Sequence, residues 1–286
     1  MFTPSREVHH DEERDARQDT QHTRGTGPGE HGAPHQSSAQ TTRDPYAASA
    51  HWPWDARRTA TVIVLWVIGA ALLALMSFAA RHAGPFPGDV SVEKWVQQLH
   101  QPALTRFINF ASDANWPKPA GITAIAIIVL LALARQIRAA LSAAFAGFGA
   151  DFVNVTLNGL VKRPRPAGGQ IHAVAHLGLY SYPSGHVTHV LAFWGFLFYL
   201  TVVPYRGHPA WRPLLWLVRV VALYFIIFIG PSRLLEGEHW PSDVLASYLL
   251  GALMLVVGVT VFHLLGMAWI RIRERRTSQH NRLATA

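Results

Sequence analysis

Six separate stretches of this chain are apolar and close to the length that crosses a bilayer, which takes about 20 residues per helix. They cover approximately residues 59–80, 119–134, 139–161, 183–203, 213–230 and 241–270. So many long apolar runs are not expected in a soluble chain of 286 residues. We therefore predict an all-α fold, an integral membrane bundle of six transmembrane helices.

The apolar residues are unevenly distributed along the chain. Half of all residues are hydrophobic, yet the first 55 are almost entirely polar and cannot bury enough surface to offset the entropy of ordering. We predict a disordered cytoplasmic tail over residues 1–55, a six-span domain over 56–271 and a basic cytoplasmic tail over 272–286. No apolar core lies near Met1, so we expect no cleaved signal peptide of the usual form.

The positive charge predicts the orientation of the chain in the membrane. The formal net charge is +8, and the cations lie beside apolar runs, which favours a membrane flank over nucleic-acid binding. One side collects Arg57, Arg58, Arg135, Arg138, Arg206, Arg212 and the arginines of 271–276. By the positive-inside rule, both termini are cytoplasmic in a plasma (inner) membrane. The absence of cysteine excludes disulfides, thiolate metal sites and cysteine nucleophiles.

Between the first two spans, residues 90–99 and 104–110 are predicted to form short amphipathic helices at the membrane interface. The third span carries polar residues at helical spacing, namely Asp151, Asn154, Asn158 and Lys162. Such a stripe is expected to face the bundle interior. It either serves helix packing or leads into a polar site at the helix end.

Three polar segments emerge together on the outer face under this topology. Residues 232–243 read S-R-L-L-E-G-E-H-W-P-S-D and place His239 and Asp243 four residues apart, with Arg233 before them. A helical turn starting there is expected to bring the Asp243 carboxylate beside the imidazole, leaving one ring nitrogen free as base or nucleophile. Arg233 offers a planar fork suited to an anionic oxygen cluster.

The other two segments supply further groups suited to phosphate. Pro183-Ser184-Gly185-His186 opens the fourth span, so backbone N–H groups at a helix start are available to phosphate oxygens. The prolines of residues 162–166, K-R-P-R-P, keep Arg163 and Arg165 in an extended segment at the membrane surface. Two histidines and two arginines on one face favour phosphoryl transfer without a metal or other cofactor. A metal site built from His172, His176, His186 and His239 is the alternative, although paired spacing and clustered carboxylates are missing.

These segments resemble the three-part motif of the type 2 phosphatidic acid phosphatase (PAP2) superfamily, which also includes vanadium haloperoxidases. The family pattern is Lys, six residues, Arg-Pro; then Pro-Ser-Gly-His; then Ser-Arg, five residues, His, three residues, Asp. The second and third parts are met without gaps, and the first is met at Arg165-Pro166 with Asn158 in place of the lysine. The resemblance covers about residues 57–276.

The resemblance implies a role for each matching residue. His239 would be the nucleophile, Asp243 its orienting partner and His186 the general acid. Arg165, Ser184, Gly185 and Arg233 would hold the phosphate. Asn158 cannot supply the charge of the missing lysine, and Lys162, one turn further along the stripe, would replace it if the helix persists that far.

The implied function is hydrolysis of a lipid phosphate or diphosphate at the outer face. Phosphatidic acid, phosphatidylglycerol phosphate and undecaprenyl diphosphate are the candidate substrates. Two alternatives stay open: vanadate-dependent haloperoxidase chemistry, and a catalytically silent membrane protein that binds lipid phosphate. The expected partners are the lipid substrate and the bilayer.

Overall fold

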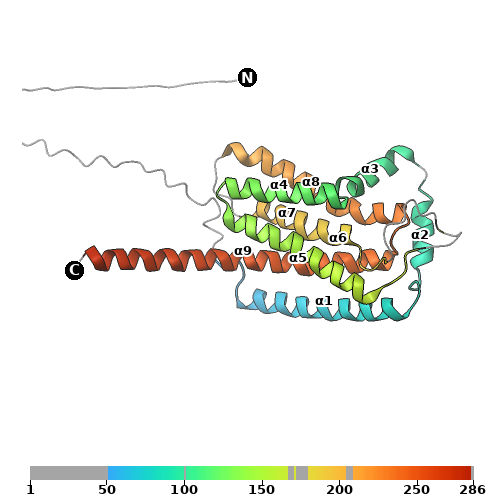
Figure 1. The fold of residues 1–286 in the computed structure, drawn as a ribbon, viewed down its shortest axis with the longest axis horizontal. Coiled ribbons are helices and arrows are strands. Elements are labelled where there is room, and N and C mark those ends of the chain that lie inside the picture. The colour runs from blue at the N-terminus through green and yellow to red at the C-terminus, as the bar shows by residue number, and fades with distance from the viewer. Residues whose placement is uncertain (1–50, 100, 167–170, 172–179, 204–208, 285–286) are drawn as a thin grey trace, which may run out of the picture. The chain divides into compact units, whose positions relative to one another are not determined.

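A computed structural model describes residues 51–99, 101–166, 171, 180–203 and 209–284, which belong to one compact unit, Thr42–Ala286. Residues 1–50 of the predicted disordered tail, His172 and His176 lie outside the described residues. Within them, the chain is helical, and two residues, Pro164 and Tyr180, form an isolated antiparallel bridge. The helices lie side by side as a bundle, which confirms the predicted fold class (Figure 1).

Nine α-helices and one π-helical turn form the bundle in the described part of the chain. They are α1 (Ala56–His82), α2 (Asp89–Gln97), α3 (Pro102–Ala114), α4 (Pro117–Leu133), α5 (Ile137–Val161), α6 (Gly185–His189), the π-helical turn η2 (Val190–Trp194), α7 (Gly195–Val202), α8 (Arg212–Leu235) and α9 (Pro241–Ala284), with α6, η2 and α7 forming one continuous span. A short 3₁₀ turn, η3 (Pro209–Trp211), precedes α8.

Five of these segments are long and apolar enough to cross a bilayer, and α3 and α4 make a sixth if the pair is one bent span. The chain is therefore a multi-pass membrane protein. The angle between α3 and α4 is 63°, and Pro117 at the start of α4 suits the first turn of a new helix. Of the predicted interfacial helices, α2 begins one residue earlier and ends two residues earlier than expected. Helix α3 is longer than expected and packs along α8.

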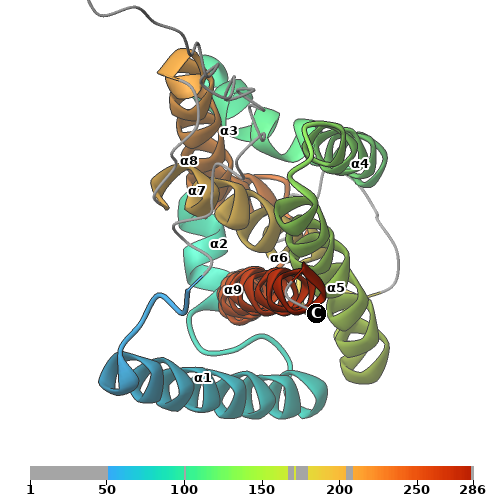
Figure 2. The ribbon, with the colours of Figure 1, turned by 90° about the vertical axis from the view of Figure 1, so that its left-hand side faces the viewer.

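Small residues allow the central helices to approach closely. The span from α6 to α7 is the most buried of the candidate spans, and it lies among α5, α8 and α9 (Figure 2). A Cβ added at Gly251 of α9 would lie 2.8 Å from Cβ of Leu191, and one added at Gly258 would lie 2.8 Å from Cβ of Ala146. Glycine at these two positions is therefore required by close packing, as in other membrane bundles.

Two predicted helix ends were wrong. The fifth span was expected to end near Gly230, but α8 continues through Pro231 to Leu235. The hydroxyl of Tyr248 accepts a hydrogen bond from the Gly230 N–H and donates one to the Ile226 carbonyl, which satisfies the backbone next to the proline. The sixth span was expected to stop at Ile270, but α9 continues to Ala284, since Arg, Glu and Gln favour helix once the apolar run has ended.

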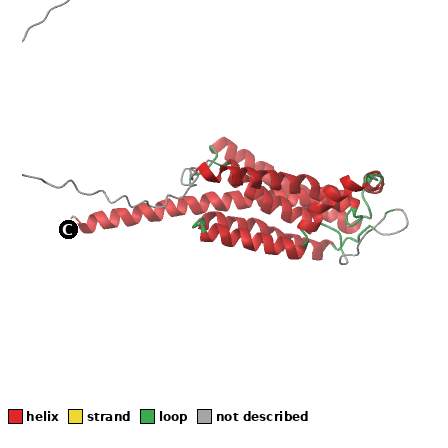
Figure 3. Ribbon diagram, turned by 90° about the horizontal axis from the view of Figure 1, so that it is seen from above, coloured by secondary structure: helices red, strands yellow, loops and turns green. Residues whose placement is uncertain are grey.

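The loops that carry the three motif segments lie together at one end of the bundle, beside α2 (Figures 1 and 3). The basic extension of α9 projects from the opposite end. The prediction that the three segments share one end is confirmed.

Candidate active site

His239 lies in the loop between α8 and α9 and is almost fully buried. Its Nδ1 is 2.7 Å from the Ser181 carbonyl oxygen, which can only accept a hydrogen bond. The proton of the neutral ring therefore sits on Nδ1, and Nε2 carries the lone pair. Burial, followed by the charges of Arg233 and Arg165, holds the pKa of His239 well below its usual value, so the ring is neutral at pH 7.

Asp243 does not hold the imidazole of His239, which corrects the sequence-based expectation. Its carboxylate accepts a hydrogen bond from the Trp240 N–H at 3.0 Å and pairs with Arg163. The carboxylate thus caps the first turn of α9, because Asp at the start of a helix satisfies its orphan N–H groups. The orienting role expected of Asp243 falls to the Ser181 carbonyl.

Arg163 was expected at the membrane surface, but its side chain is 1% exposed. It pairs with Asp243 and, at 2.9 Å, with Asp89 of α2. Asp89 in turn accepts hydrogen bonds from the N–H and the hydroxyl of Ser242. This ion cluster of Asp89, Arg163 and Asp243 fastens α2, the loop after α5 and α9 to one another beneath His239.

Arg165 lies beside the candidate nucleophile. Its Nη1 is 3.4 Å from Nε2 of His239 and donates to the Glu238 carbonyl at 2.8 Å. Burial lowers the pKa of Arg165, although the guanidinium stays charged at pH 7. A cation at this distance from the attacking nitrogen is suited to phosphoryl oxygens.

Arg233 is fully buried in the last turn of α8, and its terminal nitrogens already have acidic partners. One nitrogen contacts Ser112 and Glu236, and the other contacts Glu238. The sequence analysis did not single out Glu236 and Glu238, although both lie between Arg233 and His239 in the segment 232–243. Besides Arg165 and Arg233, the structure thus brings two carboxylates to this place, and neither was predicted from the sequence.

Ser184, Gly185 and His186 begin α6 as predicted. The Ser184 N–H donates to Ser247 Oγ at 2.6 Å, which joins this turn to α9. Nε2 of His186 and Oγ of Ser184 are buried and have no partner among the described residues. The ring of His186 lies 5.3 Å from that of Trp116, at the junction of α3 and α4. An unpartnered imidazole nitrogen at this place is available to a substrate oxygen.

The polar stripe of α5 faces the bundle interior. The Asn154 amide donates to the Pro183 carbonyl at 3.3 Å and to the Thr188 hydroxyl at 3.1 Å, and the Asn158 amide donates to the Tyr182 carbonyl at 3.2 Å. Deeper in the span, Asp151 contacts Nδ1 of His189 at 3.0 Å. Asn158 thus positions the backbone that precedes Ser184.

Lys162 does not continue this stripe. Helix α5 ends at Val161, and Lys162 adopts a left-handed conformation with φ of 55°, which turns the chain out of the helix. Its side chain is exposed. The condition on which Lys162 would replace the missing lysine, a persisting helix, is therefore not met.

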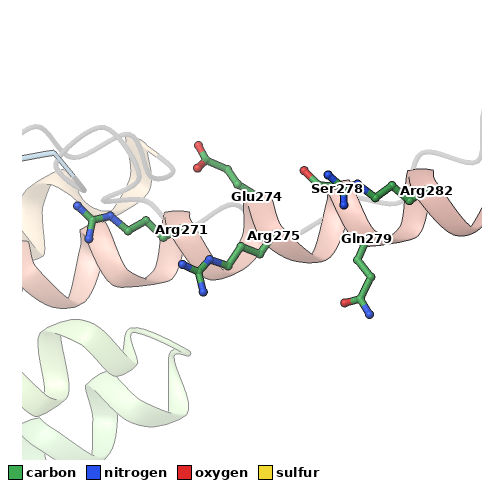
Figure 4. A pocket seen from close by; sticks show the side chains of 6 residues that line it. All are labelled: Arg271, Glu274, Arg275, Ser278, Gln279 and Arg282. Atoms are coloured by element: carbon green, nitrogen blue, oxygen red, sulfur yellow. The ribbon is translucent and has the colours of Figure 1, made fainter.

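Among the described residues, no three histidine, aspartate or glutamate side chains come together as a metal site. The structure does not test the histidines of the alternative that lie outside this range. A shallow pocket elsewhere is lined by α9 alone, with Arg271, Glu274, Arg275, Ser278, Gln279 and Arg282 around it (Figure 4). We assign it no chemistry, because a single helix supplies every lining side chain.

Comparison with known proteins bears on the family and the fold. The model of the PAP2 superfamily matches residues 137–267, which confirms the predicted resemblance. No curated protein matches the chain. A transmembrane PAP2 type phosphatidylglycerolphosphate phosphatase from Bacillus subtilis is 19% identical, with a TM-score of 0.56 over 68% of this chain and 93% of that one. Aquifex aeolicus LpxE is 17% identical, with a TM-score of 0.45 over 59% and 93%. The Bacillus likeness establishes the shared fold.

Proposed function

With residues 137–267 placed in the PAP2 superfamily, we propose that this membrane protein hydrolyses a lipid phosphate or diphosphate through a phosphohistidine. The observation that carries the proposal is the state of His239. Its Nδ1 is held by a carbonyl, and Nε2 presents a lone pair beside a guanidinium. A neutral imidazole in this tautomer is the form that attacks phosphorus.

The reaction has two steps. In the first, Nε2 of His239 attacks phosphorus, the N–P bond forms, and the bond from phosphorus to the leaving oxygen breaks as His186 gives that oxygen its proton. In the second, His186 takes a proton from water, water oxygen attacks phosphorus, and the N–P bond breaks. Phosphate leaves and both histidines return to their starting states. Arg165 and Arg233, with Ser184 and Gly185, stabilise the charge on the phosphoryl oxygens in each step.

The substrate is proposed to be a lipid, because transmembrane helices surround the site and an acyl or prenyl chain can stay in the bilayer. Phosphatidic acid, phosphatidylglycerol phosphate and undecaprenyl diphosphate carry suitable headgroups. The assay is phosphate release from each lipid by the full chain in proteoliposomes, with His239→Ala as the control. Release from one or more lipids that the variant abolishes supports the proposal. No release from any of them, with wild type equal to the variant, contradicts it.

A silent phosphate-binding protein is the second candidate, favoured by Asn158 at the position of the family lysine and by the carboxylates on Arg233. Vanadate or phosphate binding without turnover on any lipid would identify it. In the phosphatase, His186→Ala should lose phosphate release and keep phosphate affinity, whereas a binding protein has no release to lose, so turnover separates the two functions.

The site is proposed to face the outside of the cell, with the termini in the cytoplasm, on the strength of the positive-inside rule. The chain has no cysteine, so single cysteines can be introduced without background. Lys162→Cys marks the site end and Ser278→Cys marks the far end, and both positions are exposed. In intact cells, an impermeant maleimide should label the first and spare the second. The opposite pattern would reverse the orientation.

A further inference from the structure

The carboxylate of Glu238 lies against both arginines that are proposed to hold the phosphate. Its Oε2 pairs with Nη2 of Arg233 and lies 3.4 Å from Nη1 of Arg165. The side chain is 1% exposed, so the carboxylate is removed from water together with the guanidinium groups. Glu238 also immediately precedes His239, the candidate nucleophile. A negative group already stands where negative phosphoryl oxygens have to bind.

The charges of this cluster balance without a substrate. Two arginines, Arg165 and Arg233, face two glutamates, Glu236 and Glu238. A guanidinium has a fixed set of donors, and a carboxylate and a phosphate compete for them in the same bidentate geometry. A phosphate that entered while Glu238 stayed in place would meet a like charge in a buried setting, where repulsion is strong.

The two glutamates differ in what they contact. Glu236 bonds to Nη1 of Arg233 and to Ser112 of α3, on the side of the guanidinium away from Glu238. Burial raises the pKa of Glu236 even though Arg233 opposes the shift. Because Ser112 and Glu236 hold this nitrogen, Arg233 keeps its place when Glu238 leaves. Glu238 alone bridges Arg233 to Arg165.

We propose that Glu238 is a resident counter-ion, which the phosphoryl group displaces from Arg165 and Arg233 on binding. The inference rests on the proposed function and adds a positioning residue to it. In the empty site the carboxylate holds the two guanidinium groups together, and its return helps to expel the phosphate product. The exchange is one of anions, and no covalent bond forms or breaks.

The test is the sign of the change in phosphate affinity. Glu238→Gln keeps the size and the hydrogen-bonding oxygen of the side chain but removes the competing charge. The full chain in nanodiscs is titrated with inorganic phosphate and with orthovanadate, and Kd is measured by calorimetry. We expect both anions to bind about tenfold more tightly or better, since removing a juxtaposed like charge is worth at least that much. Turnover should show a lower KM and a lower kcat, because product leaves slowly.

Glu236→Gln is the matched control. It removes the same charge from the same arginine but not from the bridge to Arg165, so Kd should fall by clearly less than in Glu238→Gln. Glu238→Ala is the second variant and should also tighten binding. Weaker or unchanged binding in Glu238→Gln shows that the carboxylate only holds the arginines in place and overturns the proposal. Failure of both Glu238 variants to fold, even in excess phosphate, also overturns it, because a displaceable group must be dispensable when phosphate is bound.

This experiment separates the inference from the function on which it rests. Phosphate affinity is measured without a lipid and without turnover. Tighter binding in Glu238→Gln with no lipid hydrolysed by wild type would support the counter-ion and contradict the phosphatase. Hydrolysis by wild type with unchanged affinity in the variant would do the reverse.

Discussion

Replacing Arg163 with methionine should cost this protein a large part of its stability. The guanidinium is 1% exposed and pairs with Asp89 and Asp243, which are 3% and 0% exposed. Removing one partner of a buried ion pair costs about 3–5 kcal/mol, because a charge is left without compensation. Folded domains are stable by only about 5–15 kcal/mol. Arg163→Met leaves two carboxylates unpaired, so the upper part of the range applies.

A loss of about 4–5 kcal/mol gives an expected shift in Tm of about 8–20 °C, at about 2–4 °C per kcal/mol for a domain of this size. Thermal unfolding in detergent, followed by tryptophan fluorescence, measures it. Arg165→Met is the matched control: this side chain is 19% exposed and borders the site, so we expect a small change in Tm and a loss of phosphate release. Of the two neighbouring arginines, Arg163 is thus expected to stabilise the fold, and Arg165 is expected to act in phosphate release.

A second variant tests whether the ion cluster is the cause. Arg163→Met with Asp243→Asn removes one of the two stranded charges, and Tm should recover partway, with a coupling of about 0.5–3 kcal/mol. A Tm for Arg163→Met within about 3 °C of wild type would refute the reasoning. So would a double variant whose loss is the plain sum of the two single losses.

Three further outcomes are expected. Lys162→Ala should leave kcat/KM for any hydrolysed lipid unchanged, because the side chain is exposed beyond the end of α5; a tenfold loss would restore Lys162 to the site. Glu93 of α2 is buried, and neither of its carboxylate oxygens has a hydrogen-bond partner within the described ranges. Burial, then Asp89 and Asp243, raise its pKa to about 8, so stability that is present below pH 4.5 is lost as pH rises through 8. Glu93→Gln should therefore raise Tm at pH 8.5 and change it little at pH 5; an equal change at both would count against the assignment. Tyr248→Phe removes the hydroxyl between Gly230 and Ile226 and should lower the free energy of unfolding in denaturant by about 1–3 kcal/mol, whereas a change below 0.5 kcal/mol would show that α8 closes its own hydrogen bonds.

Most of the bundle could be predicted from the sequence, because apolar length decides what crosses a bilayer. The bounds of α1 and α5 were predicted to within three residues. The predicted ends were wrong at two places. At Pro231, a hydroxyl from another helix hydrogen-bonds to the backbone, so α8 continues past the proline. After Ile270, the residues favour helix although they are no longer apolar, so α9 continues. Neither effect is visible in a hydropathy pattern.

The candidate site could be predicted as a set of residues but not as a set of contacts. Motif spacing placed His239, His186 and Arg165 at one end of the bundle. It could not show that the Ser181 carbonyl, 58 residues upstream, accepts a hydrogen bond from Nδ1 of His239, because every residue type carries a backbone carbonyl. Arg163 and Arg165 look alike in K-R-P-R-P, and only the fold separates the buried one from the one at the site.

The partners of Arg163 also set the order in which the chain can be completed during synthesis. Asp89 precedes Arg163 by 74 residues, but Asp243 follows it by 80, at the start of the last span. A nascent chain that has inserted α1 to α8 therefore holds an incomplete ion cluster and lacks His239 and the capped start of α9. The ion cluster and the candidate active site are therefore completed by the same segment, which contains His239 and the start of α9. A truncated product ending before α9 would leave Arg163 paired with Asp89 alone and would lack the candidate nucleophile.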